Sequence, residues 1–296
     1  MRLCAALCVF LSQFTAFAIE LNSALRRLAE EAAVFSRLAP QAVSEETLLQ
    51  RVRNKPSRFQ PRQGPAPDSG FRSRRIVSEY GYTTFEDSPG VLHELRRVIE
   101  VDGHPVRTKL DARTSLSLGM ASRDDRVKRR MLREFEQYGL GSAVVDLGQL
   151  ILLFEQHRQS DYQFHYLATG SLGGVPVTIF TFNQVGGAGA VTVFQGRTLR
   201  RNLLEGEIWS REPDGLPLRI VLRTSYDSDR GSASSEAITN YAMSSHGVLL
   251  PVTIVHREYV NDELQVENIY IYKPFRRFAA DSSIRFEGEK PAGKAP

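Results

Sequence analysis

The chain has 296 residues, a formal net charge of +4 at pH 7, 42% hydrophobic residues and 24% charged residues. This composition can fill a core and excludes collagen-like, acidic disordered and multi-span membrane proteins. Both cysteines, Cys4 and Cys8, lie close to the N-terminus, so the rest of the chain offers no disulfide scaffold, thiolate zinc site or cysteine nucleophile.

A signal peptide is predicted over residues 1–18. Arg2 precedes an apolar run from Leu3 to Phe17, and Ala16-Phe17-Ala18 has the small-x-small pattern that signal peptidase cleaves. The run of about fifteen residues is shorter than the roughly twenty that a membrane-spanning helix needs. We therefore expect an exported protein, periplasmic or extracellular, that loses both cysteines on cleavage.

Residues 19–54 are predicted to form a separate helical unit of two helices. The first carries a heptad seam that consists of Leu21, Leu25, Leu28, Ala32, Phe35 and Ala39, and it ends at Pro40. Ser44 followed by two glutamates is typical of a helix start, so a second helix is expected from Ser44 to Arg53. A proline-rich linker is expected over residues 55–74.

An antiparallel sheet is predicted over residues 75–286, followed by a disordered tail over 287–296. Ile76–Phe85 and Val91–Val101 alternate apolar and polar residues, and Asp102-Gly103 is typical of a tight hairpin turn. In the second of these strands, Glu94 and Arg96 are expected on the outer, polar face. Eight further strands are expected between turn signals: Tyr162–Ala168, Val175–Phe182, Ala190–Phe194, Leu204–Arg211, Leu216–Tyr226, Ala237–Ser244, Val248–Tyr259 and Leu264–Tyr272.

A helical insertion is predicted over residues 122–158. Ser122 and Asp125 resemble a capping box at the start of one helix. A second helix, Ser142 to about His157, is apolar nearly all round and is expected to be buried on more than one side. The predicted fold is therefore α+β: a curled antiparallel sheet of about ten strands, an incomplete barrel, with a helical plug or lid and a leading helix pair.

Catalytic and metal-binding motifs do not emerge from the sequence. Ser171 does not stand in a nucleophile elbow, and Arg97 replaces the second histidine that a zinc motif starting at His93-Glu94 would need. The loop Asp227–Gly231 lacks a ligand at the fifth position of a calcium loop. We assign no catalytic residue, metal or cofactor and expect a protein that is not an enzyme, with scattered carboxylates converging in space as the alternative.

One helix face is basic. Arg126, Lys128, Arg129, Arg130 and Arg133 could meet an anionic membrane surface, or they could form an ordinary solvated face. Export and the small net charge argue against nucleic acid as a partner.

Several strand motifs look familiar together. Gly206–Glu212, Leu216–Ile220, His246–Pro251 and Tyr270–Phe278 resemble the C-terminal strands of the LolA-like family of periplasmic, outer-membrane lipoprotein-sorting carriers. The N-terminal half, with Arg74–Tyr80 and Glu100–Val106, is similar to a group of uncharacterised secreted bacterial proteins.

The resemblance implies an incomplete barrel with a helical lid over an apolar concavity that accepts acyl chains. The expected function is therefore binding of a lipid or a lipid-anchored protein, with these residues as the lining: Phe164, Tyr166, Ile179, Ile220, Leu222, Val252 and Ile254, with Leu150 and Phe154 on the lid. Two alternatives stay open: these side chains form an ordinary core, or the protein is an envelope scaffold that binds a partner through its N-terminal helix.

Overall fold

A computed structural model describes residues 21–54, 70–138, 140, 146–187, 191–195, 198–228 and 231–278. The predicted signal peptide, residues 55–69 of the predicted linker and the predicted tail lie outside these residues. Among the described helices, none is long and apolar enough to cross a membrane.

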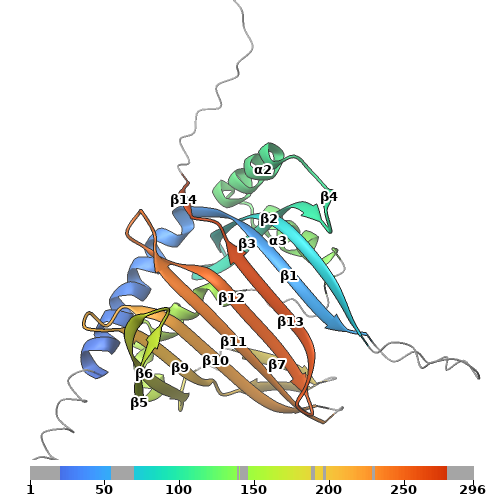
Figure 1. Cartoon of the computed structure of the whole chain (residues 1–296). Helices are drawn as coiled ribbons and strands as arrows, with labels where there is room; N and C mark the ends of the chain where they lie inside the picture. Colours follow the sequence, from blue (N-terminus) through green and yellow to red (C-terminus); the bar gives the residue numbers. More distant parts are fainter. Residues whose placement is uncertain are drawn as a thin grey trace, which may run out of the picture.

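Most strands belong to one antiparallel sheet of twelve strands (Figure 1). Its order is β4-β3-β2-β1-β13-β12-β11-β10-β9-β6-β5, and β14 pairs with β1. The strands are β1 (Ala42–Arg53), β2 (Phe71–Phe85), β3 (Ser88–Val101), β4 (His104–Pro105), β5 (Tyr162–Leu172), β6 (Val175–Gln184), β9 (Glu205–Arg211), β10 (Pro217–Ser228), β11 (Gly231–Met243), β12 (Leu249–Val260), β13 (Glu263–Tyr272) and β14 (Arg276–Arg277). The edge strands β4 and β5 do not pair with each other, so the predicted open antiparallel sheet and α+β class are confirmed.

A separate hairpin joins β7 (Val191–Gln195) to β8 (Thr198–Asn202). Strand β8 was not among the strands predicted from the sequence. The predicted turn at Asp102-Gly103 is confirmed: both residues have positive φ, 51° and 84°, and they connect β3 to β4.

The predicted helix over Ser44–Arg53 is wrong, because these residues form most of β1. Buried and less buried side chains alternate along β1, with Ser44, Glu46, Leu48 and Gln50 all at most 2% exposed. The Ser44 hydroxyl, which the sequence analysis assigned to a helix cap, donates to the carbonyl oxygen of Lys273 at 2.6 Å. Pairing with β2 and β13 thus overrides the local helix signal.

Residues 19–54 are consequently not a separate unit. β1 lies in the interior of the sheet, between β2 and the C-terminal strand β13. Residues 71–74, expected in the linker, are the first residues of β2.

Residues 21–38 form the predicted N-terminal helix, followed by η1 (Ala39–Gln41). A Cβ atom on Gly215, which follows β9, would lie 3.3 Å from Ala24, and the ring of Phe35 contacts Tyr82 of β2 at 5.4 Å between centroids. The helix therefore crosses the sheet from β9 to β2 (Figure 1). Leu28, which is 1% exposed, and the rest of the buried seam pack into the protein's own core.

The helical insertion differs from the prediction. It begins with α2 (Lys109–Ala121), which the sequence analysis missed. The next helix, α3 (Asp125–Glu136), is capped by Asp124 rather than Ser122, because the Asp124 carboxylate accepts a hydrogen bond from the Arg126 backbone N–H.

The predicted helix over Ser142–His157 is two 3-10 helices, η2 (Leu147–Phe154) and η3 (Gln156–Asp161), and residues 141–145 lie outside the described residues. The backbone leaves helical geometry at Gln149 and again at Glu155, whose ψ is 147°. Burial on several sides is confirmed for Leu150, Ile151 and Phe154, which are at most 6% exposed.

Candidate functional site

The inner face of the sheet, the N-terminal helix and η2 share one hydrophobic core. Five predicted lining residues lie in this core: Ile220, Leu222 and Ile254 from the sheet, and Leu150 and Phe154 from η2. Phe164 packs against it while partly exposed. The inner face is therefore covered by η2, which we call the plug (residues 146–154, including Asp146 before η2).

The other three predicted lining residues lie elsewhere. Ile179 points to the outer face, because its neighbour Phe180 faces inward beside Ala24 of the N-terminal helix. Tyr166, on the edge strand β5, is 37% exposed. Val252 is 38% exposed because the β11–β12 register shifts by one residue there, so that simple alternation fails.

Side chains of β11 hold the backbone of the plug. The Thr239 hydroxyl donates to the Leu147 carbonyl at 2.9 Å, and the Tyr241 hydroxyl donates to the Gly148 carbonyl at 3.2 Å. The Ile151 N–H donates to the Tyr241 oxygen at 3.3 Å. Burial raises the pKa of Tyr241 well above its ordinary value, so the hydroxyl keeps the proton that it donates. The inner face is thus equipped to bind a polar backbone as well as apolar groups.

A buried ionic cluster anchors the start of the plug to β1 and β3. Arg96 binds both oxygens of Glu46, at 2.7 and 2.8 Å, and one oxygen of Glu94 at 2.7 Å. The other oxygen of Glu94 accepts the Gly148 N–H at 2.8 Å. All three charged side chains are at most 3% exposed. Burial alone would lower the pKa of Arg96, but Glu46 and Glu94 outweigh it and raise that pKa well above its ordinary value.

Asp146 is a third acidic side chain beside this cluster. Its carboxylate accepts the Glu94 backbone N–H at 3.1 Å. Burial, reinforced by the negative charge of Glu94, raises the pKa of Asp146 to about 7. Two carboxylates already face the single guanidinium of Arg96, so a third ionised carboxylate is disfavoured there.

Aromatic rings enclose the ionic cluster. The Arg96 guanidinium lies 5.0 Å from the ring centroids of Tyr80 and Phe135 and 5.7 Å from that of Tyr270. Gly148 is required here, since a Cβ atom would lie 2.9 Å from the Tyr82 hydroxyl and from Glu94. The prediction that Glu94 and Arg96 lie on the outer, polar face is wrong. Alternation identified the two faces of β3 but not which face turns inward.

A second polar group lies on the same inner face, across β1, β13 and β12. The Gln50 amide donates to the Asn268 side-chain oxygen at 2.7 Å, and the Asn268 amide lies 3.3 Å from His256 Nδ1. Burial lowers the pKa of His256 to about 4, so the imidazole is neutral and can accept that hydrogen bond.

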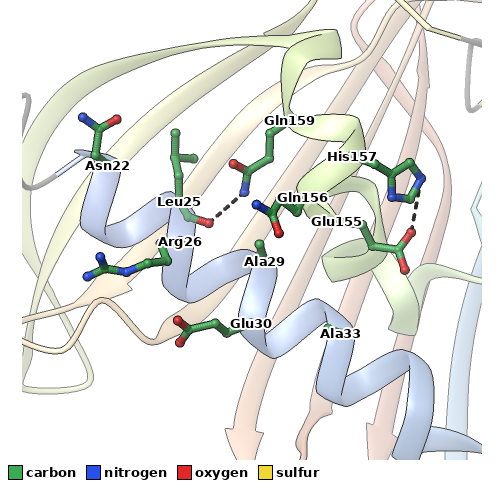
Figure 2. Close-up of a pocket in the computed structure, with 10 residues that line it drawn as sticks. All are labelled: Asn22, Leu25, Arg26, Ala29, Glu30, Ala33, Glu155, Gln156, His157 and Gln159. Atoms are coloured by element: carbon green, nitrogen blue, oxygen red, sulfur yellow. Dashed lines mark hydrogen bonds and ion pairs between the residues drawn. The ribbon is translucent and has the colours of Figure 1, made fainter.

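A groove of about 760 Å³ separates the N-terminal helix from η3 (Figure 2). Leu25, Ala29 and Ala33 contribute its apolar part, and charged or polar side chains form its rim, Arg26, Glu30 and His157 among them. Gln159 spans the two walls, because its amide donates to the Leu25 carbonyl at 2.7 Å (Figure 2) and to that of Phe154 at 3.3 Å. The groove therefore lies beside the end of the plug.

In the part of the chain that the structure describes, no three histidine, cysteine or acidic side chains form a group that could hold a metal ion. This arrangement offers a ligand apolar contact on the inner face, backbone hydrogen bonds from β11, and a buried charge cluster at one end.

No model of a known protein family matches the chain, and no curated protein matches its sequence. Several solved structures are similar to it over most of its length, among them the following three. A LolA superfamily protein from Nitrosomonas europaea is 11% identical, with 86% of this chain and 93% of that chain covered and a TM-score of 0.30. An outer membrane lipoprotein-sorting protein domain from Vibrio parahaemolyticus is 10% identical, with 84% and 90% covered and a TM-score of 0.34. A DUF1329 family protein from Desulfovibrio piger is 9% identical, with 86% and 92% covered and a TM-score of 0.36.

Proposed function

We propose that this protein is an exported, non-enzymatic binding protein for a lipid or a lipid-anchored protein, and that an acyl chain takes the place of the plug. One observation carries the proposal. The apolar inner face of an open sheet is covered by a short 3-10 segment, which is held by side chains of the sheet rather than by strand pairing.

The energies allow such an exchange. Leu150, Ile151 and Phe154 bury their side chains on the inner face, each contributing roughly 1.5–3 kcal/mol. An acyl chain on the same surface recovers a burial term of the same kind. The hydrogen bonds from Thr239 and Tyr241 contribute about 0.5–1.5 kcal/mol each, and the bond from the Gly148 N–H to the Glu94 carboxylate contributes about 1.5–3 kcal/mol. None of these bonds belongs to the strand pairing, so the plug can leave without unfolding the sheet.

The groove beside the plug offers a route of entry. Its volume of about 760 Å³ lies within the roughly 300–1,000 Å³ of small-molecule sites. Leu25 reaches from the groove to the core, and Phe154 lies at the end of the plug next to Gln159. An acyl chain would enter past Ala29 and Ala33 and meet Phe154 first.

A tryptophan in the plug tests this function. The chain has one tryptophan, Trp209 of β9, so Trp209→Phe with Phe154→Trp leaves a single reporter in the plug. We expect palmitate to shift the emission of this tryptophan to longer wavelength as it leaves the core, and native mass spectrometry to detect the bound lipid. Leu153→Trp, at a partly buried position, serves if the first variant does not fold.

The matched control places the reporter at Ile271, an exposed position on β13, in the same Trp209→Phe background. Its emission should not respond to palmitate. A folded Phe154→Trp variant that shows neither an emission shift nor a lipid adduct would contradict the proposed function.

A further inference from the structure

The outward face of α3 is made of arginine. Arg126, Arg130 and Arg133 recur at spacings of four and three residues, which places them on one side of the helix, and Arg123 precedes it. All four are exposed, and none has a carboxylate partner among the side chains that the structure describes, which do not include that of Glu136.

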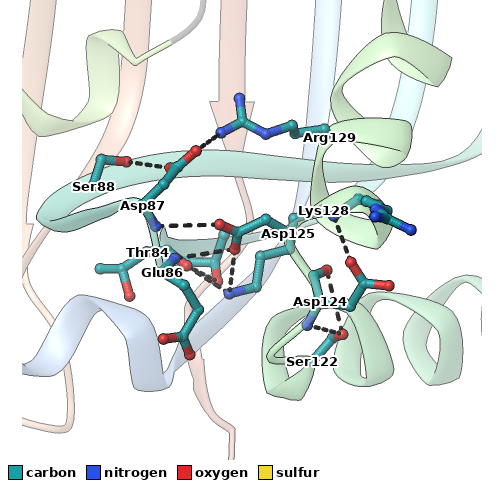
Figure 3. Close-up of polar contacts among 11 residues, drawn as sticks. Thr84, Glu86, Asp87, Ser88, Ser122, Asp124, Asp125, Lys128 and Arg129 are labelled. Carbon is teal, nitrogen blue, oxygen red and sulfur yellow. Dashed lines mark hydrogen bonds and ion pairs between the residues drawn. The ribbon is translucent and has the colours of Figure 1, made fainter.

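The inner side of the same helix is fastened to the β2–β3 turn (Figure 3). The Asp125 carboxylate accepts the backbone N–H groups of Glu86 and Asp87, at 3.1 and 3.3 Å. The Lys128 ammonium, only 5% exposed, donates to the Thr84 carbonyl at 2.6 Å. Arg129 forms an ion pair with Asp87. The expectation that Lys128 and Arg129 belong to a free basic surface is therefore corrected, because one is buried and the other is paired.

The three arginines on this face of α3 repel one another. Arg126 and Arg130, and then Arg130 and Arg133, are like charges one turn apart, and Arg126 lies in the first turn, at the positive end of the helix dipole. Several exposed arginines elsewhere have a nearby carboxylate, as in the pairs Arg27–Glu31, Arg51–Glu267, Arg75–Glu100 and Arg223–Glu207. A run of cations without counter-ions indicates an anionic partner that supplies them.

The adjacent helix adds exposed apolar side chains. Leu110 and Leu118 of α2 are 72% and 63% exposed, and they lie eight residues apart, on the side opposite the buried Ala112 and Leu116. Val127 of α3 is 37% exposed. Both helices pack against β3 and against each other, so the leucines and the arginines belong to neighbouring helices of one layer.

We propose that α2 and α3 form a docking surface for an anionic lipid membrane. Two convex helices with projecting leucines and long arginine stems fit a fluid interface, where apolar groups enter the boundary and guanidinium groups meet phosphates. An acidic protein partner is the alternative that the vesicle experiment distinguishes from a membrane. This surface lies on different elements from the plug and the groove, so the inference goes beyond the proposed function and does not depend on it.

Vesicle sedimentation tests the docking surface with the intact mature protein. We expect binding to vesicles that contain about 30% phosphatidylglycerol, weak binding to pure phosphatidylcholine vesicles, and a loss of binding in high salt. Arg126→Gln, Arg130→Gln and Arg133→Gln together should lower the partition onto anionic vesicles roughly 100-fold, at about fivefold per arginine.

The control removes the same charge elsewhere. Arg37, Arg72 and Arg277 are exposed, lie outside α3 and have no carboxylate partner among the described residues. Changing all three to Gln should lower vesicle binding far less. An equal loss in both triple variants, or no binding to anionic vesicles at all, would overturn the proposal and point to general charge or to an acidic protein partner.

Substitution of the two exposed leucines of α2 tests the apolar contact with the membrane separately. Leu110→Ser with Leu118→Ser should weaken binding several-fold while the salt dependence stays the same, because only the apolar contact is lost. Ala29→Trp in the groove, which blocks the proposed lipid entry, should leave vesicle binding unchanged. Loss of lipid uptake and loss of docking are therefore separate results, and unchanged binding by the leucine variant would contradict insertion into the boundary.

Discussion

At the scale of single residues, the site depends on charges that alternation along a strand cannot locate. The sequence predicted the two faces of β3 but assigned Glu94 and Arg96 to solvent. The structure turns them inward, where Glu46 of β1 meets the same guanidinium. The sequence alone does not show that Glu46 lies near Arg96, because β1 and β3 lie on either side of β2 only once the sheet has formed. Tyr80 and Tyr82 on β2 were the available signal, since aromatic rings often enclose a buried guanidinium.

We expect the loss of the Arg96 side chain to destabilise the folded protein strongly. Arg96→Met leaves Glu46 and Glu94 buried without a counter-ion, so we expect the free energy of unfolding to fall by about 3–5 kcal/mol in urea titration. Arg223→Met is the control, because Arg223 pairs with Glu207 and Glu236 while 40% of its side chain is exposed. That change should cost less than about 1 kcal/mol. Similar losses in both variants would contradict the buried cluster.

Asp146 predicts a pH dependence with a definite sign. Its pKa is about 7 in the folded protein, above its ordinary value of 3.8, so between these values the unfolded chain releases a proton that the folded chain keeps. The contribution of protonated Asp146 to the free energy of unfolding is complete below about pH 4 and is lost as the pH rises through 7. The free energy of unfolding falls over this range by no more than about 1.4 kcal/mol per pH unit. Asp146→Asn retains a residue that tolerates the positive φ of 69° and cannot ionise.

Unfolding free energies measured between pH 5 and pH 8 check this. Wild-type protein should lose stability over the interval relative to Asp146→Asn. Parallel pH profiles for the two proteins would show that Asp146 does not titrate there.

At the scale of secondary-structure elements, tertiary contacts override two helices that local sequence signals predict. The serine and glutamates at 44–46 resemble a helix start, but β2 and β13 draw this segment into the sheet. The apolar run at 147–154 was recognised as buried, yet its backbone breaks at Gln149 and Glu155 so that its carbonyl groups can meet Thr239 and Tyr241. Apolar content predicts burial, whereas the helix type depends on partners far away in the sequence.

Tyr241→Phe tests how the plug is held. It removes one hydroxyl that donates to Gly148 and accepts from Ile151, which should weaken plug docking by about 1–3 kcal/mol. We expect faster uptake of a fluorescent fatty acid, about tenfold where plug opening limits the rate. Tyr226→Phe, a half-buried tyrosine on β10, should leave uptake at the wild-type rate. Equal uptake rates for Tyr241→Phe and wild type would mean that the plug does not control entry.

At the scale of the whole molecule, one open sheet wraps a helix and a plug. The predicted antiparallel architecture is confirmed because turn residues and alternation recur locally along the chain. The strand order could not be predicted, since it pairs β1 with β13 across more than two hundred residues. The heptad seam of residues 21–38 was left open between a partner protein and the chain itself. Its burial in the common core shows that the chain itself covers it.

Hydrogen exchange of the full mature protein, with and without palmitate, tests the central claim most directly. Displacement of the plug by an acyl chain predicts that the amides of Gly148 and Ile151, both hydrogen-bonded in the closed state, lose protection when lipid is added. The amides of β11 and β12 should keep theirs, because strand pairing is not broken. Unchanged or increased protection across residues 147–154 with lipid bound would contradict the account.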